Sequence, residues 1–245
     1  MTYLFIYLTP LINFLLFEVF FFKASFFYTA LLLSNLFLAL AITRITGKKI
    51  NTVEFWNFCI LPLIFSNFLA AYSLLVVNHY IIQFLFVINL FFILLYLNNI
   101  YQGERGGFLE NFSSYSNFLA IFFSFSVIYG LKVFLDMPVW ILVLVAAVVI
   151  VLVIHQIFWA YKVRFEASII YTLISCLVLV QIAWAIYFLP FNYNTLGLIL
   201  AICYYMLIGL IKSSFGGKLT SRNLKLYLIS GLGSILILLL TAKWA

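Results

Sequence analysis

The residues of this chain that could do chemistry are few, and the most regular of them are four asparagines in four successive apolar segments. Asn13, Asn35, Asn67 and Asn89 each lie near the middle of a hydrophobic run. An amide buried in hydrocarbon must find a hydrogen-bond partner, since leaving it unpaired costs free energy. The asparagines therefore predict contacts between neighbouring helices or a polar patch that lines a path for a substrate or ion. Helix pairing is the favoured interpretation, because such pairs contribute about 0.6 kcal/mol each and need no charge at the same depth.

Glu18 and Lys132 are the two charged residues that lie within apolar segments, each about one helical turn from the end. An acid inside a membrane is a functional candidate and should have a partner. If the fifth segment runs in the same direction as the first and the two touch, Glu18 and Lys132 share a depth near the outer face and can form an ion pair. Alternatively, Lys132 pairs with Asp136 four residues later, and Glu18 reaches outward toward Lys23. A role in handling protons or ions is the functional alternative.

His155 and Gln181 complete the polar candidates. Histidine titrates near neutral pH, so His155 is a candidate titratable group in a vestibule open to the cytoplasm. A hydrogen bond to a neighbouring helix is the favoured alternative. Gln181, three residues before Trp184, is predicted to make an interhelical contact.

Signatures of enzymes are missing from the sequence. It contains no HExxH pair, and no pair of aspartates has the helical spacing that holds Mg²⁺. The segment Gly216-Gly217-Lys218 is not a phosphate loop, because Lys212 replaces the earlier glycine and Leu219 replaces the Ser or Thr. The three cysteines form no CxxC pair. The sequence therefore predicts no enzymatic activity, no metal site and no cofactor.

The composition indicates the elements that position these residues. Hydrophobic residues make up 67% of the chain and charged residues 8%, whereas soluble domains carry roughly 25% charged residues. About 20 apolar residues in a helix cross the hydrocarbon layer. The chain is therefore predicted to be an all-α polytopic transmembrane helix bundle, a single transmembrane domain over residues 1–245. About nine spans are expected, at approximately 3–21, 25–43, 54–77, 80–98, 116–135, 139–160, 167–189, 195–212 and 226–242.

Basic residues indicate the orientation. Ten of the 13 lysines and arginines fall on one side of this arrangement, which predicts a cell membrane protein with its N-terminus in the cytoplasm and its C-terminus outside. The expected partners of these residues are anionic lipids at the cytoplasmic face, and no nucleic acid is needed to explain the net charge of +7. The ten are Arg44, Lys48, Lys49, Arg105, Lys162, Arg164, Lys212, Lys218, Arg222 and Lys225.

The last third of the chain resembles a known group of proteins. The residues concerned are Gln181, Trp184, Leu189-Pro190, Gly197, Tyr204-Tyr205 and Lys243-Trp244. They are similar to a family of uncharacterised small polytopic membrane proteins of candidate-phyla bacteria with reduced genomes. The resemblance implies a bacterial multi-pass membrane protein without an assigned activity, and it transfers no catalytic residue.

Two functions are compatible with these features. The first is a structural or accessory component of a membrane complex, in contact with other membrane proteins. The alternative is a small transporter or channel that uses the asparagine patch and Glu18.

Overall fold

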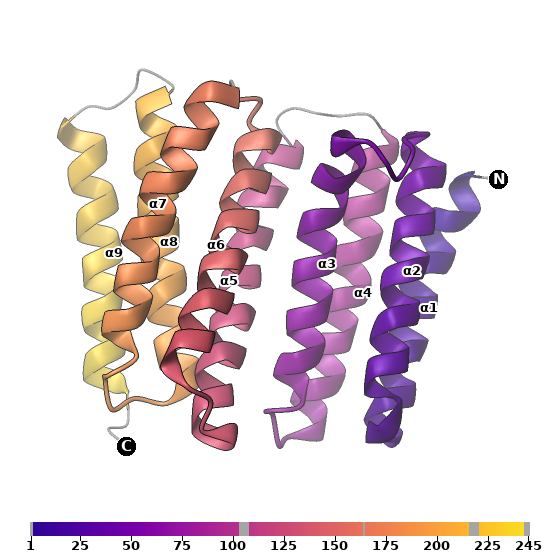
Figure 1. The fold of residues 1–245 in the computed structure, drawn as a ribbon, viewed down its shortest axis with the longest axis horizontal. Helices are drawn as coiled ribbons and strands as arrows, with labels where there is room; N and C mark the ends of the chain where they lie inside the picture. Colours follow the sequence, from indigo (N-terminus) through magenta and orange to yellow (C-terminus); the bar gives the residue numbers. More distant parts are fainter. Residues whose placement is uncertain (1, 103–107, 164, 216–220, 243–245) are drawn as a thin grey trace. The chain divides into compact units, whose positions relative to one another are not determined.

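A computed structural model describes residues 2–102, 108–163, 165–215 and 221–242. These residues form nine α-helices and one short 3-10 helix (Figure 1). All nine α-helices are long and apolar enough to cross a membrane, which confirms the predicted all-α membrane class. The elements are α1 Thr2–Phe22, η1 Ala24–Phe26, α2 Phe27–Thr46, α3 Val53–Ser73, α4 His79–Tyr101, α5 Phe108–Leu135, α6 Val139–Ala160, α7 Phe165–Ile186, α8 Tyr193–Phe215 and α9 Ser221–Thr241.

Several helix boundaries differ by three or more residues from those predicted by hydropathy, and the end of α3 and the start of α5 are two of them. α3 was expected to continue to residue 77 but ends at Ser73, where the backbone N–H of Leu75 bonds the carbonyl of Tyr72 at 2.9 Å. Such tight terminal bonds close a helix even where the following residues are apolar. α5 begins eight residues earlier than expected, at Phe108. Its first turns contain serines, which lower the mean hydropathy and so gave the appearance of a loop. Two of them, Ser113 and Ser116, are nevertheless buried.

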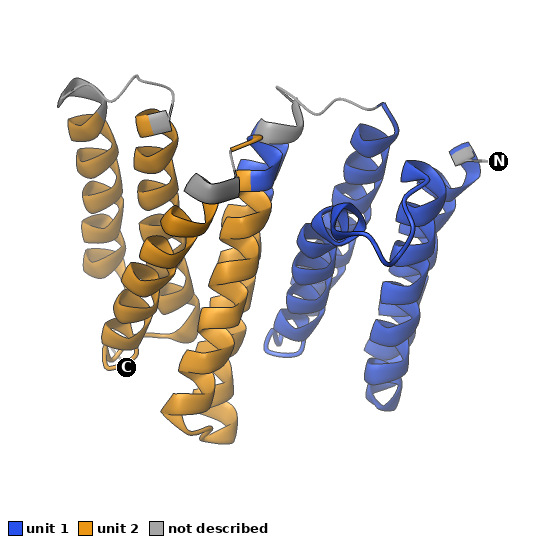
Figure 2. Cartoon of the chain, turned by 45° about the horizontal axis from the view of Figure 1, so that its top comes forward, with its two compact units in different colours: residues 1–116, 159–161 blue, residues 117–158, 162–245 orange. Residues whose placement is uncertain are grey.

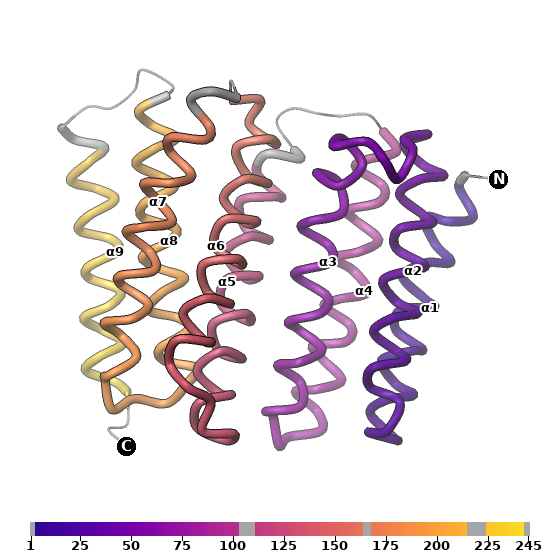
Figure 3. The backbone as a smooth tube through the Cα atoms, in the orientation of Figure 1, coloured from indigo at the N-terminus to yellow at the C-terminus, as the bar shows by residue number. Residues whose placement is uncertain are grey.

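Capping residues define several helix ends. The Thr52 side chain accepts a hydrogen bond from the Phe55 N–H at the start of α3, and the Asn78 side chain accepts one from Tyr80 at the start of α4. Each bond satisfies one of the N–H groups that a helix start leaves open. Gly47 ends α2 with φ +66°, a conformation that glycine adopts without a side-chain penalty. The connection between α1 and α2, seen in Figure 3, consists of Lys23 and η1 alone.

The chain divides into two compact units, coloured in Figure 2. Unit 1 comprises residues 1–116 and 159–161, and unit 2 comprises residues 117–158 and 162–245. In unit 1, α1 packs against α2 and α4, α2 also packs against α3 and α4, and α3 packs against α4. In unit 2, α8 packs against α7 and α9. The single transmembrane domain over residues 1–245 stays a prediction, and each unit is described by itself below.

Aromatic side chains fill much of the core of unit 1. Phe17 of α1 lies edge-on to Phe86 of α4, with ring centroids 5.4 Å apart. Phe65 of α3 stacks on Phe92 of α4 at 3.9 Å. These contacts hold α4 between α1 and α3 and bring the midsections of the helices together.

Close backbone approach joins α5 to α8 in unit 2, in addition to the aromatic pairs Phe118–Tyr205 and Phe134–Tyr193. Gly197 of α8 lies so close to α5 that a Cβ atom there would be 2.8 Å from the backbone N of Ser126. The same atom would be 3.1 Å from the carbonyl O of Phe122. Small residues are typical of helix contacts in membranes, where close packing drives association.

Candidate functional site

The four predicted asparagines lie in one buried layer of unit 1, with two serines as additional members. We call this set the amide layer. Its hydrogen bonds join consecutive helices, α1 to α2, α2 to α3 and α3 to α4. Ser34 Oγ donates to Asn13 Oδ1. Asn35 Nδ2 donates to Asn67 Oδ1 at 3.1 Å. Ser66 Oγ donates to Asn89 Oδ1 at 2.9 Å.

Most of the amide layer is closed to its surroundings. Asn13 and Asn89 are both 0% exposed, and so are the two serines. Asn35 and Asn67 are half-buried. The layer therefore contains the interhelical contacts that the asparagine spacing predicts, and its two end members are inaccessible from the surface.

Three polar atoms of the layer have no hydrogen-bond partner among the described residues. They are Nδ2 of Asn13, Nδ2 of Asn89 and Oδ1 of Asn35. The first two belong to the contacting helices α1 and α4, in the stretch bracketed by the ring pairs Tyr3–Tyr101 and Phe17–Phe86. Amide N–H groups donate hydrogen bonds and do not coordinate cations. This part of the layer can bind a hydrogen-bond acceptor such as water, which often satisfies buried polar groups.

Glu18 also has a partner inside unit 1. Gln83 Nε2 of α4 donates to Glu18 Oε2 at 3.1 Å, and both side chains are half-buried. Gln83 was not predicted from the sequence, although it is an isolated polar residue in the first turns of an apolar span. The bond is a further link between α1 and α4.

Lys132 lies in the last turn of α5, in unit 2. Its Nζ atom is 3.5 Å from the centroid of the Tyr187 ring, a cation–π contact. The predicted ion pair with Glu18 would join the two units, and it stays a prediction.

A second buried amide pair lies in unit 2. Asn117 Nδ2 of α5 donates to Gln156 Oε1 of α6 at 2.7 Å, and both side chains are 0% exposed. Asn117 was missed because it lies among serines, where the sequence showed no isolated polar residue. His155, beside Gln156, is half-buried. Gln181 is exposed on α7, so the structure does not bring it to either set of amides.

The predicted basic face follows the connections that come after even-numbered helices. Arg44 lies in the last turn of α2, and Lys48 and Lys49 follow that helix. Lys162 lies between α6 and α7, and Lys212 is in the last turn of α8. Lys48 forms an ion pair with Glu54 at the start of α3. Lys225 is exposed on α9. Arg105, Arg164 and Lys218 lie outside the described residues, as does the side chain of Arg222.

Apolar helices joined by buried interhelical amides define a multi-pass integral membrane protein. Comparison with protein families then gives a more specific assignment. The chain belongs to a family described as a protein of unknown function, DUF5656, which matches residues 110–242. No curated protein and no solved structure matches the chain.

The family assignment confirms that the chain has relatives without an assigned activity. The match is longer than the last third on which the resemblance was based, and it begins near the start of α5. It therefore covers α5 to α9, while the amide layer lies outside it. A bacterial source stays a prediction, and Lys243-Trp244 lie outside both the match and the described residues.

Proposed function

We propose that this protein is a non-catalytic accessory component of a membrane complex and that α9 is its docking helix. The observation that carries this proposal is the packing of α9. Gly231 is the only buried residue among positions 224–241 of that helix. Its contact with α8 is close, since a Cβ atom on Gly231 would lie 2.8 Å from Cε of Met206. Tyr227 of α9 also packs against Gly209 of α8, and the exposed residues of the helix are left for lipid or for another protein.

The exposed side of α9 has the properties of a helix-packing surface. Leu232 and Leu236 are each 59% exposed. Gly233 has open space where a side chain would be, with no heavy atom within 4 Å of a Cβ atom. Ser230 and Ser234 satisfy their own hydroxyl groups by bonding to carbonyls of the same helix. A partner helix could therefore approach closely without leaving a polar group unpaired.

The amide layer also favours an accessory role over transport. Its hydrogen bonds are made between neighbouring helices of unit 1. A path for a hydrophilic solute needs polar groups that the solute can reach, whereas Asn13 and Asn89 are completely buried. Pairing of helices is a sufficient role for these side chains.

Site-specific photo-crosslinking in native membranes tests the docking role. A photoreactive residue at Leu236 of α9 should give a discrete crosslinked product that contains a different membrane protein. The matched control is Leu173, whose side chain is 63% exposed on a different helix, α7. Equal crosslinking at both positions, or a Leu236 product that contains only a second copy of this chain, would contradict the proposal.

A small transporter or channel is the second candidate. Two observations favour it: the N–H groups of Asn13 and Asn89 have no partner among the described residues, and Gln83 donates a hydrogen bond to Glu18. Purified protein in lipid vesicles should then support solute flux, and Asn89→Leu and Glu18→Gln should each reduce it while the helical content is unchanged. Flux that is absent, or unaffected by these substitutions, would leave the accessory role as the better explanation.

A further inference from the structure

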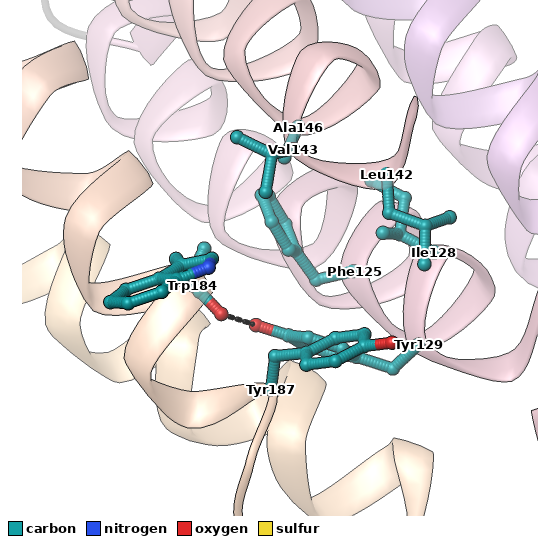
Figure 4. Close-up of a pocket in the computed structure, with 9 residues that line it drawn as sticks. Phe125, Ile128, Tyr129, Leu142, Val143, Ala146, Trp184 and Tyr187 are labelled. Carbon is teal, nitrogen blue, oxygen red and sulfur yellow. Dashed lines mark hydrogen bonds between the residues drawn. The ribbon is translucent and has the colours of Figure 1, made fainter. Parts of the chain in front are cut away.

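Unit 2 contains an apolar pocket that none of the functions above uses. It lies between α5, α6 and α7 and has an empty volume of about 250 Å³ (Figure 4). This volume includes space that is open to the surroundings, so the feature is a shallow groove and not an enclosed cavity, and it suits a flexible chain that lies along the helices. The lining residues are Phe125, Ile128, Tyr129, Leu142, Val143, Ala146, Ala183, Trp184 and Tyr187.

The inner wall of the pocket offers a ligand apolar contacts. Phe125, Leu142 and Ala146 are buried side chains that form part of it. The Tyr129 hydroxyl, also in the wall, already donates to the carbonyl O of Ala183 at 3.0 Å, as Figure 4 shows. Trp184 is 52% exposed, so one side of the pocket opens to the surroundings of the helix bundle. In a membrane those surroundings are lipid chains.

A cation lies beside this pocket. The Tyr187 ring, which lines the pocket, carries the Lys132 ammonium group over its face at 3.5 Å from the ring centroid. Within unit 2, no carboxylate of the described residues lies within ion-pair distance of Lys132. Asp136 follows one turn later. Its backbone N–H donates a hydrogen bond to the backbone carbonyl O of Lys132, so this bond does not involve the Asp136 carboxylate or the Lys132 ammonium group. The ammonium group is therefore available to an anion.

The depth of Lys132 agrees with a lipid headgroup. It lies in the last turn of α5, so its flexible side chain can hold the ammonium group at the membrane interface. Tyrosine and tryptophan rings, here Tyr187 and Trp184, are typical of the same level. This end of α5 is on the side opposite to the predicted cytoplasmic face, which carries the ten basic residues. A general attraction of anionic lipids to those basic loops therefore does not account for lipid binding at Lys132.

We propose that this pocket is a specific site for an anionic glycerophospholipid. One acyl chain occupies the cleft between α5, α6 and α7, and Lys132 donates a hydrogen bond to the phosphate group. The apolar wall accounts for the chain, and the cation accounts for the headgroup. This inference is independent of the accessory role proposed above, because it concerns a site on unit 2 that does not include α9.

Native mass spectrometry of the full-length protein in detergent, titrated with phosphatidylglycerol or phosphatidylcholine, tests the site. We expect one phosphatidylglycerol molecule to bind more tightly than phosphatidylcholine. Lys132→Gln should weaken phosphatidylglycerol binding about tenfold, because it removes a hydrogen bond to a charged group. Asp136→Asn should strengthen binding, because it removes a neighbouring negative charge. The control is Lys225→Gln, which changes an exposed lysine of α9 and should have no effect.

Two further variants test the chain-binding part of the site. Ala146→Leu adds volume to the pocket wall, and Trp184→Ala removes a wall residue that is half exposed and therefore contributes little to the core. Both should weaken the binding of phosphatidylglycerol while Lys132 is intact. Equal effects of Lys132→Gln and Lys225→Gln would overturn the headgroup assignment. Unchanged lipid binding in the folded Trp184→Ala variant would overturn the pocket assignment.

Discussion

The contact between Gly197 and α5 leads to a quantitative prediction for the Gly197→Ala substitution. Alanine is a better helix former than glycine, which by itself would stabilise the helix by about 0.5–1 kcal/mol. Here the new methyl group would lie 2.8 Å from Ser126 N and 3.1 Å from Phe122 O. Both are backbone atoms, so no side-chain rotation relieves the overlap, and α5 and α8 must separate. Overpacking of this kind costs about 1–3 kcal/mol, which leaves a net destabilisation of about 1 kcal/mol at the middle of the two ranges and about 2.5 kcal/mol at most.

Gly233→Ala is the matched control for this experiment. Gly233 also lies inside a helix, but no heavy atom lies within 4 Å of the place that an alanine methyl group would take. This variant should keep the gain in helix propensity and leave the protein as stable or slightly more stable. Reversible unfolding in mild detergent, followed by tryptophan fluorescence and circular dichroism, measures the difference between the two variants. If Gly197→Ala is as stable as Gly233→Ala, close backbone packing of α5 and α8 does not stabilise unit 2.

Three further substitutions test individual contacts. Ser66→Ala should destabilise unit 1 by about 1 kcal/mol, since it leaves the Asn89 amide unpaired, whereas Ser66→Ala with Asn89→Leu should recover most of that loss in the same unfolding assay. Additive losses in the double variant would contradict the pairing. Tyr129→Phe should cost about 0.5–1.5 kcal/mol through the lost bond to the Ala183 carbonyl; an unchanged unfolding midpoint would count against that bond. Glu54→Gln should change stability by less than about 1 kcal/mol, because the side chains of the ion pair with Lys48 are 40% and 50% exposed, and a larger loss would contradict a weak, solvent-screened pair.

The class of fold could be predicted from the sequence because hydropathy over about 20 residues reports directly on membrane insertion. The ends of helices were less predictable. Residues 74–77 are apolar but form a turn after α3, and Ser113 is polar but buried in α5. A hydropathy window averages over all sides of a helix and therefore cannot show on which side a polar residue lies.

The same limit explains why the sequence did not predict the partners of the candidate residues. Gln181 and Gln156 are both glutamines within apolar spans, yet Gln181 is exposed and Gln156 is completely buried against Asn117. Lys132 had plausible partners in sequence, but its contact with Tyr187 joins α5 to the turn that follows α7. Side-chain direction and helix packing decide such partners, and a single sequence contains neither.

The order of polar residues along unit 1 nevertheless encodes which helices are neighbours. α1 and α4 contribute one asparagine each to the amide layer, whereas α2 and α3 contribute the dipeptides Ser34-Asn35 and Ser66-Asn67. Successive residues on a helix point about 100° apart, so a polar dipeptide can bond to two different neighbours.

Each dipeptide is used in this way. In α2 the serine bonds to α1 and the asparagine to α3, and in α3 the asparagine bonds to α2 and the serine to α4. The helices at the ends of the hydrogen-bonded series, α1 and α4, each contribute a single asparagine to the amide layer, because each has only one neighbour in that series. Among the described residues, the side-chain N–H groups of Asn13 and Asn89 have no hydrogen-bond partner. This follows from the arrangement, because no further helix continues the series beyond α1 or α4, and these two helices contact each other through aromatic side chains instead.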